Sequence, residues 1–184
     1  MLLEIVKYGH PALRKKGLPV KQIDEKLRTF VVNMFETMEE ANGVGLAAQQ
    51  VGVPIQLAIV DVTGVEDRPS TMTIAGEPVD VEEQMPLVLI NPEVELGPEK
   101  ELGTEGCLSF PEITGEIPRS VRVKTRATNL DGEEIEFEAT GLLARAIQHE
   151  FDHLQGVLFI DRMNSAKKAS LAGRLKQMHR ENEP

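Results

Sequence analysis

Two histidines and a glutamate form the pattern with the clearest chemical meaning in this sequence, His149-Glu150-Phe151-Asp152-His153. Residues four apart on a helix lie one above the other on the same face, so both imidazoles can bind one metal ion. Glu150 follows the first histidine and can hold a proton beside a metal-bound water without being a ligand itself. Two ordinary core histidines are the alternative, but the intervening glutamate makes a chance pattern less frequent. The spacing therefore predicts a metal site.

A third ligand has to come from elsewhere, because a catalytic zinc-type site has three protein ligands and one open position. The single cysteine, Cys107, lies in the segment EGCLSFP at residues 105–111. A lone cysteine is most often a small buried hydrophobe. A thiolate is nevertheless a strong ligand for iron or zinc, and Gly106 allows the backbone to approach a ligand closely. A structural zinc would need a fourth protein ligand, and the chain offers no obvious one.

A glycine-rich stretch, GVGLAAQQVGVP at residues 43–54, has two interpretations. Its glycine spacing does not match a dinucleotide fingerprint, and no predicted strand precedes it. It is either a structural turn or a backbone that lines a cleft. In the second case the side-chain amide of Gln50 or Gln49 is a candidate hydrogen-bond donor.

The histidines require a helix to position them, and residues 140–156 have the composition of one. Thr140 is a candidate N-cap, and Gly156 suits the left-handed residue just past a helix end. Apolar residues occur on most sides, which predicts a largely buried helix: Leu142, Leu143, Ala146, Ile147, Phe151 and Leu154.

Two further helices are predicted. Residues 24–41 have apolar side chains at helical spacing, with Asp24 as N-cap and Asn42-Gly43 as the stop. Residues 164–180 form the second helix, and they place three apolar side chains on one face: Leu171, Leu175 and Met178.

Strands are predicted from short apolar or alternating runs. We expect Pro92 to end the strand at residues 87–91. The polar excursion at residues 63–85 is predicted to be a long hairpin or a partly mobile loop. The other expected extended segments are residues 55–62, 93–102, 117–128, 133–139 and 157–161.

Composition excludes several classes of protein. The chain has 184 residues, a formal net charge of -10, 41% hydrophobic and 4% aromatic residues, which argues against a DNA-binding protein. The single cysteine fits a reducing compartment. The apolar run at the N-terminus is too short for a secretory signal, Glu4 interrupts it, and no stretch approaches a membrane span. We therefore expect one domain over residues 1–184 and a cytoplasmic location.

Three motifs together, GVGLAAQQ at residues 43–50, EGCLS at residues 105–109 and QHEFDH at residues 148–153, give the chain a resemblance to peptide deformylase. The resemblance extends over nearly the whole chain, from HPALR near the start. It implies an α+β fold with antiparallel β-sheets packed around a central metal-binding helix, an N-terminal helix and a C-terminal helix. It also implies an enzyme that removes the formyl group from N-formylmethionyl nascent peptides and releases formate.

The resemblance also implies roles for individual residues. A metal-bound water would attack the formyl carbonyl, with Glu150 as the acid–base. Gln50 and the backbone N–H of Leu108 would hold the carbonyl oxygen. One divalent ion would be bound, Fe(II) in the cell, with Ni, Co or Zn in preparations. Its ligands would be Cys107, His149 and His153, and the extended peptide would pair with the backbone at Val44, Gly45 and Gly106.

Arg145 and Ala146 are expected at the pocket for the methionine side chain. Arg145 replaces an apolar residue often found there, so it either changes the polarity of the pocket or turns its charge to solvent while its stem lines the wall. Glu105 and Arg119 match a pair that braces the cysteine loop.

Two rival functions remain at this point. A zinc peptidase of the H-E-x-x-H type would share His149, Glu150 and His153, but normally uses Glu or His as its third ligand. A non-enzymatic protein that docks on the ribosome is the second rival. Residues 165–184 carry five Lys or Arg and only two Asp or Glu, so the C-terminal helix could bind ribosomal RNA or be merely a solvated cationic face. We expect a monomer.

Overall fold

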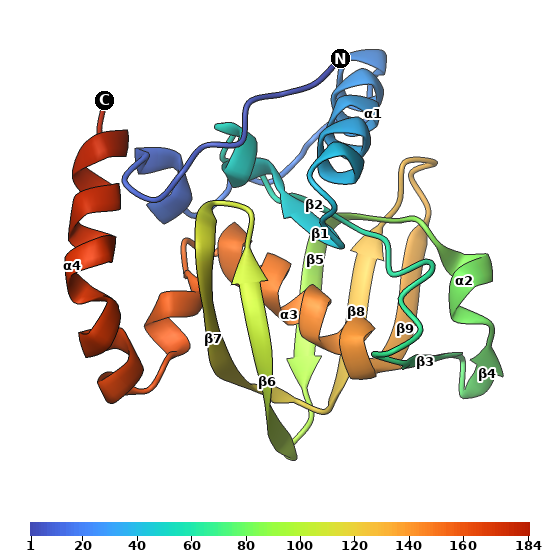
Figure 1. Ribbon diagram of the computed structural model, residues 1–184. Coiled ribbons are helices and arrows are strands. Elements are labelled where there is room, and N and C mark those ends of the chain that lie inside the picture. Colours follow the sequence, from blue (N-terminus) through green and yellow to red (C-terminus); the bar gives the residue numbers. More distant parts are fainter.

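The computed structural model describes residues 1–184 as a seven-stranded antiparallel sheet, a separate hairpin and helices around them (Figure 1). The strand order in the large sheet is β1-β2-β5-β8-β9-β3-β4, and β6 pairs with β7 in the hairpin. The predicted α+β class with antiparallel sheets is confirmed. The strands are β1 (Gly45–Ala47), β2 (Leu57–Val60), β3 (Ser70–Ile74), β4 (Glu77–Val79), β5 (Leu87–Leu96), β6 (Lys100–Cys107), β7 (Phe110–Ser120), β8 (Arg122–Thr128) and β9 (Glu134–Thr140).

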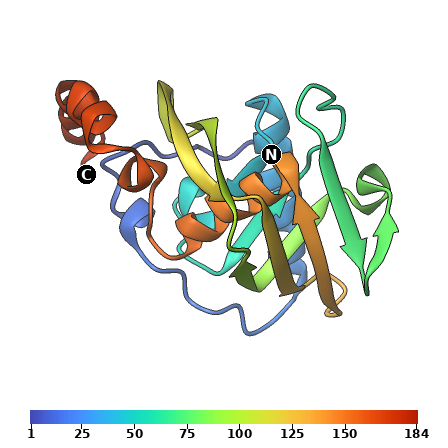
Figure 2. The ribbon, with the colours of Figure 1, turned by 90° about the horizontal axis from the view of Figure 1, so that it is seen from below.

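The central helix α3 (Gly141–Leu154) lies against the large sheet and is buried along most of its length (Figures 1 and 2). Its apolar side chains form one core cluster with side chains of the sheet, which include Val60, Leu89, Val123 and Phe137. The helix was predicted from residue 140 to 156. Its existence and burial are confirmed, and its ends lie within two residues of the predicted ones.

The predicted capping role of the Thr140 side chain is wrong. Thr140 occupies the N-cap position, but its hydroxyl bonds to the Thr71 hydroxyl of the neighbouring strand β3. Ser70 caps the helix instead, since its Oγ accepts a bond of 2.9 Å from the Leu143 N–H. A neighbouring strand thus replaces the local cap and ties the start of α3 to the sheet.

Pro92 does not end a strand, contrary to prediction. β5 continues through it to Leu96, and the pairing with β8 shifts register between Ile90 and Glu93. Asn91 has a φ of 51° at this irregularity. Proline is tolerated at bulges because the ladder there lacks a regular bond. The segment expected as one strand at residues 93–102 is therefore divided between β5 and β6.

Two other extended segments also differ from prediction. The run at residues 117–128 is broken at Val121, where the chain leaves the hairpin and enters the large sheet. Residues 157–161 are extended only as far as Leu158. The 3-10 helix η3 (Phe159–Arg162) follows, and Asp161 Oδ2 accepts the Leu158 N–H at 2.9 Å.

The excursion at residues 63–85 contains the predicted hairpin, formed by β3 and β4, and the short helix α2 (Val81–Gln84). The hairpin extends the sheet at its edge, because β3 pairs with β9. Two more 3-10 turns complete the chain, η1 (Pro11–Arg14) and η2 (Ala48–Val51).

The two outer helices that were predicted are both present. In α1 (Glu25–Glu40), the Asp24 carboxylate accepts the Leu27 N–H at 2.9 Å, and Asn42 adopts a φ of 56° just past the end. The C-terminal helix α4 (Ser165–Asn182) packs Leu171 and Leu175 against a cluster formed by β7 and η3. It lies at the side of the molecule away from α1 (Figures 1 and 2).

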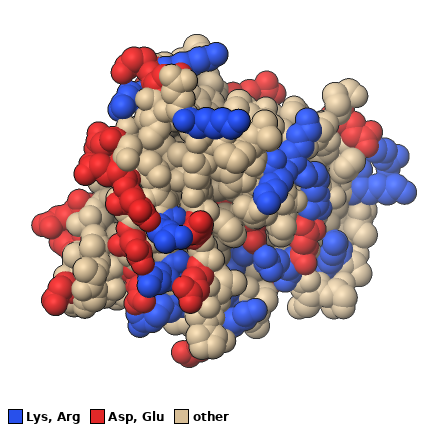
Figure 3. Space-filling model, turned by 180° about the vertical axis from the view of Figure 1, so that it is seen from behind, with Lys and Arg blue, Asp and Glu red and all other residues tan.

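Charged side chains of both signs are interspersed on the face seen from behind (Figure 3). Exposed cross-strand ion pairs connect β8 and β9, for example Lys124 with Glu136 at 3.2 Å. Such exposed pairs contribute little to stability. No helix is long and apolar enough to cross a membrane.

Candidate active site

A cleft of about 510 Å³ opens beside the central helix. One wall is the free edge of β1, the facing wall is the hairpin of β6 and β7, and α3 forms the floor. Most residues predicted for the site line this cleft: Val44, Gly45, Gln50, Gly106, Cys107, Leu108, Arg145, Ala146, His149 and Glu150. The fold thus brings together the three separate motifs that were singled out from the sequence.

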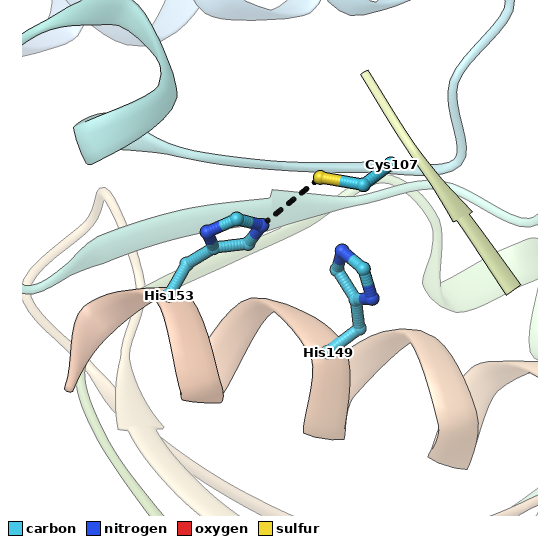
Figure 4. Close-up of side chains that lie close together, drawn as sticks. All are labelled: Cys107, His149 and His153. Carbon is cyan, nitrogen blue, oxygen red and sulfur yellow. Dashed lines mark hydrogen bonds between the residues drawn. The ribbon is translucent and has the colours of Figure 1, made fainter. Parts of the chain in front are cut away.

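Cys107, His149 and His153 lie at the inner end of the cleft, and their ligand atoms are all within 4.8 Å of one another. Figure 4 shows the thiol of Cys107 above the two imidazoles, which project from successive turns of α3. The Sγ atom of Cys107 is 3.4 Å from Nε2 of His153. Both histidines are buried, at 8% and 1% exposure.

This donor set fits a transition-metal ion. Ligands on one tetrahedral ion, at about 2.3 Å for sulfur and 2.1 Å for nitrogen, are about 3.6 Å apart, close to the observed separation of Cys107 and His153. A thiolate with two imidazoles is a donor set that suits iron, zinc, nickel or cobalt. Asp152, the aspartate between the two histidines, forms ion pairs with Arg119 and Arg162 instead. Three ligands without a fourth are typical of a catalytic site.

The charge around His149 also favours a cation. Burial lowers the pKa of His149, but the carboxylate of Glu150 and the bonds with Cys107 and Glu105 outweigh burial and raise this pKa well above its usual range. Burial and then the charge of His149 lower the pKa of His153 well below normal. The carboxylates and the thiol around His149 therefore favour positive charge at this point of the cleft.

Glu105 holds His149 from the hairpin side. Its Oε1 is 2.8 Å from Nδ1 of His149, which leaves Nε2 of that imidazole free to face Cys107. Arg119 donates to both carboxylate oxygens, from Nε at 2.8 Å and from Nη2 at 2.9 Å. Burial alone would raise the pKa of Glu105, but the bonds from Arg119 and His149 lower it to about 2. The predicted pair of Glu105 and Arg119 is present, and both residues are buried.

Glu150 is 4% exposed and points toward β1. A β-carbon at Gly45 would lie 2.5 Å from Oε2 of Glu150, so only glycine at position 45 leaves room for this carboxylate. Burial raises the pKa of Glu150 to about 7, and the charge of His149 offsets only part of that shift. The Oε1 atom has no hydrogen-bond partner in the protein. A carboxyl group with a pKa near neutrality and a free oxygen can both accept and donate a proton.

Gln50 and Leu108 place two N–H donors near the thiol. The side-chain oxygen Oε1 of Gln50 accepts the Ala47 N–H at 3.0 Å. This bond directs the side-chain nitrogen Nε2 toward Cys107 Sγ at 3.6 Å and Ser109 Oγ at 3.3 Å. The Leu108 N–H makes no backbone hydrogen bond. Gln49, the other candidate amide, points away and donates to the Lys15 carbonyl at 3.4 Å.

The charge of Arg145 does not point to solvent, contrary to one of the two expectations. The side chain is 7% exposed, and its guanidinium donates to the Glu105 carboxylate and to two backbone carbonyls of the hairpin. Local sequence gives no signal for these acceptors, which lie 28 to 44 residues away along the chain.

Sequence reasoning missed several lining residues. Arg68 reaches the cleft from the excursion before β3, because Pro69 O and Ser70 Oγ bond to the first N–H groups of α3. Thr114 and Phe110 of β7 line the opposite wall. Arg68 and Thr114 lie in no motif, and Phe110 lies in the EGCLSFP segment without a role assigned to it there, so only the folded chain places them at the cleft.

Comparison with known proteins gives a consistent result. The family model described as polypeptide deformylase matches residues 2–169. The peptide deformylase of Methylacidiphilum infernorum is 49% identical over 180 residues, which cover 98% of this chain and 94% of that protein. The crystal structure of peptide deformylase from Thermotoga maritima is 43% identical, with a TM-score of 0.76 and coverage of 89% of this chain and 99% of that chain. For peptide deformylase from Plasmodium falciparum the identity is 32%, the TM-score 0.83, and the coverage 96% and 95%.

Proposed function

The chain belongs to the polypeptide deformylase family, and on that premise we propose that it is a metal-dependent enzyme that hydrolyses the N-formyl group of formyl-methionyl nascent peptides at this cleft. The observation that carries the proposal is the convergence of one cysteine and two histidines beside a buried glutamate, between two free strand edges. We treat residues 1–184 as a single deformylase domain.

Cys107, His149 and His153 would hold one divalent ion. Bound there, the ion would supply Lewis-acid polarisation of the formyl carbonyl and would acidify the attacking water. Fe(II) is the ion we propose for the cell, with Ni, Co or Zn as replacements in preparations. The mixed sulfur and nitrogen donor set supports this range of ions and does not select one of them.

Glu150 is the proposed acid–base. Because its pKa lies near 7, the carboxylate can take a proton from the attacking water and the acid can return it to the leaving nitrogen. The missing side chain of Gly45 leaves room for Oε2, and the unpartnered Oε1 is the atom that would carry the proton.

The developing negative charge on the formyl oxygen needs donors that are already oriented. We assign this role to the amide nitrogen of Gln50 and the N–H of Leu108. The bond from Ala47 to the Gln50 carbonyl supports the assignment, because it determines which end of the amide faces the cleft. One such donor is typically worth about 2.7–4 kcal/mol in the transition state.

The peptide is proposed to enter as an additional strand. β1 has a partner only on its β2 side and β6 only on its β7 side, so unpaired backbone groups face the cleft from both walls. Val44 and Gly45 would pair on one side and Gly106 on the other. Ala146 and the stem of Arg145 would then contact the methionine side chain.

A Glu150→Gln variant tests this mechanism. It should retain about one metal ion per chain and lose formate release by roughly 100-fold or more, since general acid–base catalysis contributes about 10²–10⁴-fold. A metal-loaded variant that turns over at the parent rate would remove Glu150 from the mechanism. Cleavage of internal peptide bonds, with no action on formyl peptides, would instead support the peptidase alternative.

We place the reaction in the cytoplasm, on a monomer, and propose ribosome docking through α4. Support for docking comes from the exposed basic side chains of α4, which include Lys167, Lys168 and Lys176. Truncation would uncover Leu171 and Leu175, so charge reversal of the lysines is the better test. Unchanged pelleting with ribosomes after reversal would leave α4 as a solvated face.

A further inference from the structure

Arg145 connects the helix of the two histidines with both strands of the hairpin that carries Cys107. Its Nη1 donates to Glu105 Oε2 at 2.8 Å and to the Ile117 carbonyl on β7 at 2.8 Å. Its Nη2 donates to the Glu101 carbonyl on β6 at 3.0 Å. Three acceptors on two strands leave this buried guanidinium little freedom to move.

Arg145 and His149 are one helical turn apart and lie on the same face of α3. Both reach the same carboxylate, since Arg145 donates to Oε2 of Glu105 and His149 Nδ1 lies 2.8 Å from Oε1. An ionised carboxylate offers about four acceptor positions. Arg119 occupies two of them, Arg145 the third and His149 the fourth. The orientation of the imidazole therefore depends on a carboxylate that Arg145 helps to fix.

The guanidinium has room because position 103 is glycine. A β-carbon at Gly103 would lie 2.7 Å from Cζ and 2.8 Å from Nη2 of Arg145, closer than such contacts occur in proteins. Gly103 pairs with Ile117 in the hairpin, so it sits beside one carbonyl that Arg145 uses. Any side chain at position 103 would push the guanidinium away from its acceptors.

We propose that Arg145 is a positioning residue whose guanidinium, seated over Gly103, orients the Glu105 carboxylate that holds His149. Positions 103 and 145 then act as one unit that determines how firmly the metal is retained. This inference rests on the proposed metal centre and adds to it two residues that contact neither the ion nor the reacting atoms.

The test is the rate at which metal passes from the loaded protein to an excess of chelator. Arg145→Met keeps the stem and removes the donors, and Gly103→Ala displaces the guanidinium without changing it. Loss of a partner that orients a metal ligand typically costs about 10–100-fold in metal affinity or activity. We expect metal loss roughly 10-fold faster in both variants, no further increase in the double variant, and an intermediate rate for Arg145→Lys. The absorption bands of the cobalt-loaded protein should shift in the same variants.

Two control variants should exchange metal at the parent rate. Arg126→Met removes an exposed arginine that is paired with Glu93, and Gly173→Ala adds a methyl group where no atom lies within 4 Å. Circular dichroism at the assay temperature establishes that each variant is folded. Where Arg145→Met does not fold, Gly103→Ala and Arg145→Lys test the inference, each by its expected increase in the rate of metal loss.

Metal loss within about twofold of the parent in both Gly103→Ala and the Arg145 variants would overturn the inference. Independent effects that multiply in the double variant would also overturn it, because they would show that the two positions do not share one contact. A parent protein that binds no metal would overturn the proposed metal centre, and the inference with it. A parent that binds metal, with variants that retain it equally well, would overturn the inference alone.

Discussion

Glu105→Gln is the substitution whose effect on the free energy of unfolding can be derived most directly from the structure. The pKa of Glu105 falls from 4.5 to about 2 on folding, because Arg119 and His149 outweigh the effect of burial. This lowering corresponds to roughly 3 kcal/mol in favour of the folded state with the ionised carboxylate. Since the side chain is only 5% exposed, solvent screening does not reduce this figure much.

The loss of free energy of unfolding in Glu105→Gln depends on pH because folding lowers the pKa of Glu105. A group whose pKa is lowered on folding stabilises the protein above its unfolded pKa, and the contribution is lost as the pH falls through the folded pKa. The contribution of Glu105 should therefore be complete at pH 7, at roughly 3 kcal/mol, and should fall to roughly 1 kcal/mol at pH 3.

The assay is urea unfolding of the metal-free parent and of Glu105→Gln at several pH values between 7 and 3. Subtraction of the two free energies of unfolding removes the titrating groups that Glu105 does not influence, so the difference reports Glu105 together with its partner His149. Glu136→Gln is the matched control, because Glu136 is half exposed and pairs only with Lys124 on the surface. A difference below about 1 kcal/mol at pH 7, or one that does not change with pH, would mean that Arg119 and His149 do not hold Glu105 ionised in the folded protein.

Four further predictions concern other parts of the molecule. Gly45→Ala should lower formate release by about 100-fold, because the new methyl group would displace the Glu150 carboxylate, and steady-state kinetics with unchanged metal content measures this. Chelation should abolish formate release, and one equivalent of metal should restore it in the same assay. Leu171→Ala should lower the free energy of unfolding by about 2–4 kcal/mol, measured in urea, since Leu171 is the buried side chain by which α4 packs on the core cluster. Burial would raise the pKa of Asp161, but bonds from Arg14 and a backbone N–H lower it, so its contribution to stability is lost as the pH falls below about 3.8. Arg14→Gln should therefore lower the melting temperature at pH 6 and have a smaller effect near pH 3.

Each of these four has a contrary result. Parent-like turnover of Gly45→Ala would mean that Glu150 is not fixed by its contact with β1. Formate release that survives complete chelation would exclude a metal from the reaction. A loss below about 1 kcal/mol for Leu171→Ala would show that α4 adds little to the core. A difference between parent and Arg14→Gln that is the same at both pH values would exclude titration of Asp161.

Local spacing predicted the parts of the site that lie on one element. The two histidines and Glu150 share a helix, and the 3.6-residue period alone places both imidazoles on one face. Cys107 is different, because it lies 42 or more positions away. Its chemistry and the resemblance to a family made it a candidate, and only the pairing of β6 with β7 shows how it reaches the helix.

Sequence reasoning failed where a distant strand replaced a local partner. Thr140 has the residue type of a cap, but Ser70 from a neighbouring strand makes the bond. Pro92 has the residue type of a strand end, but a bulge accommodates it. The partners of Arg145 come from β6 and β7, so no local pattern indicates that its charge is buried and paired.

Whether this cleft removes formyl groups is decided by formate release from formyl-Met-Ala-Ser, measured on protein purified without oxygen, with the bound metal quantified on the same sample. Oxygen is excluded because a thiolate ligand such as Cys107 is open to oxidation. We expect rapid release together with about one metal ion per chain. A fully metal-loaded protein that releases no formate would contradict this expectation, and would mean that this cleft acts on another acyl group or on internal peptides.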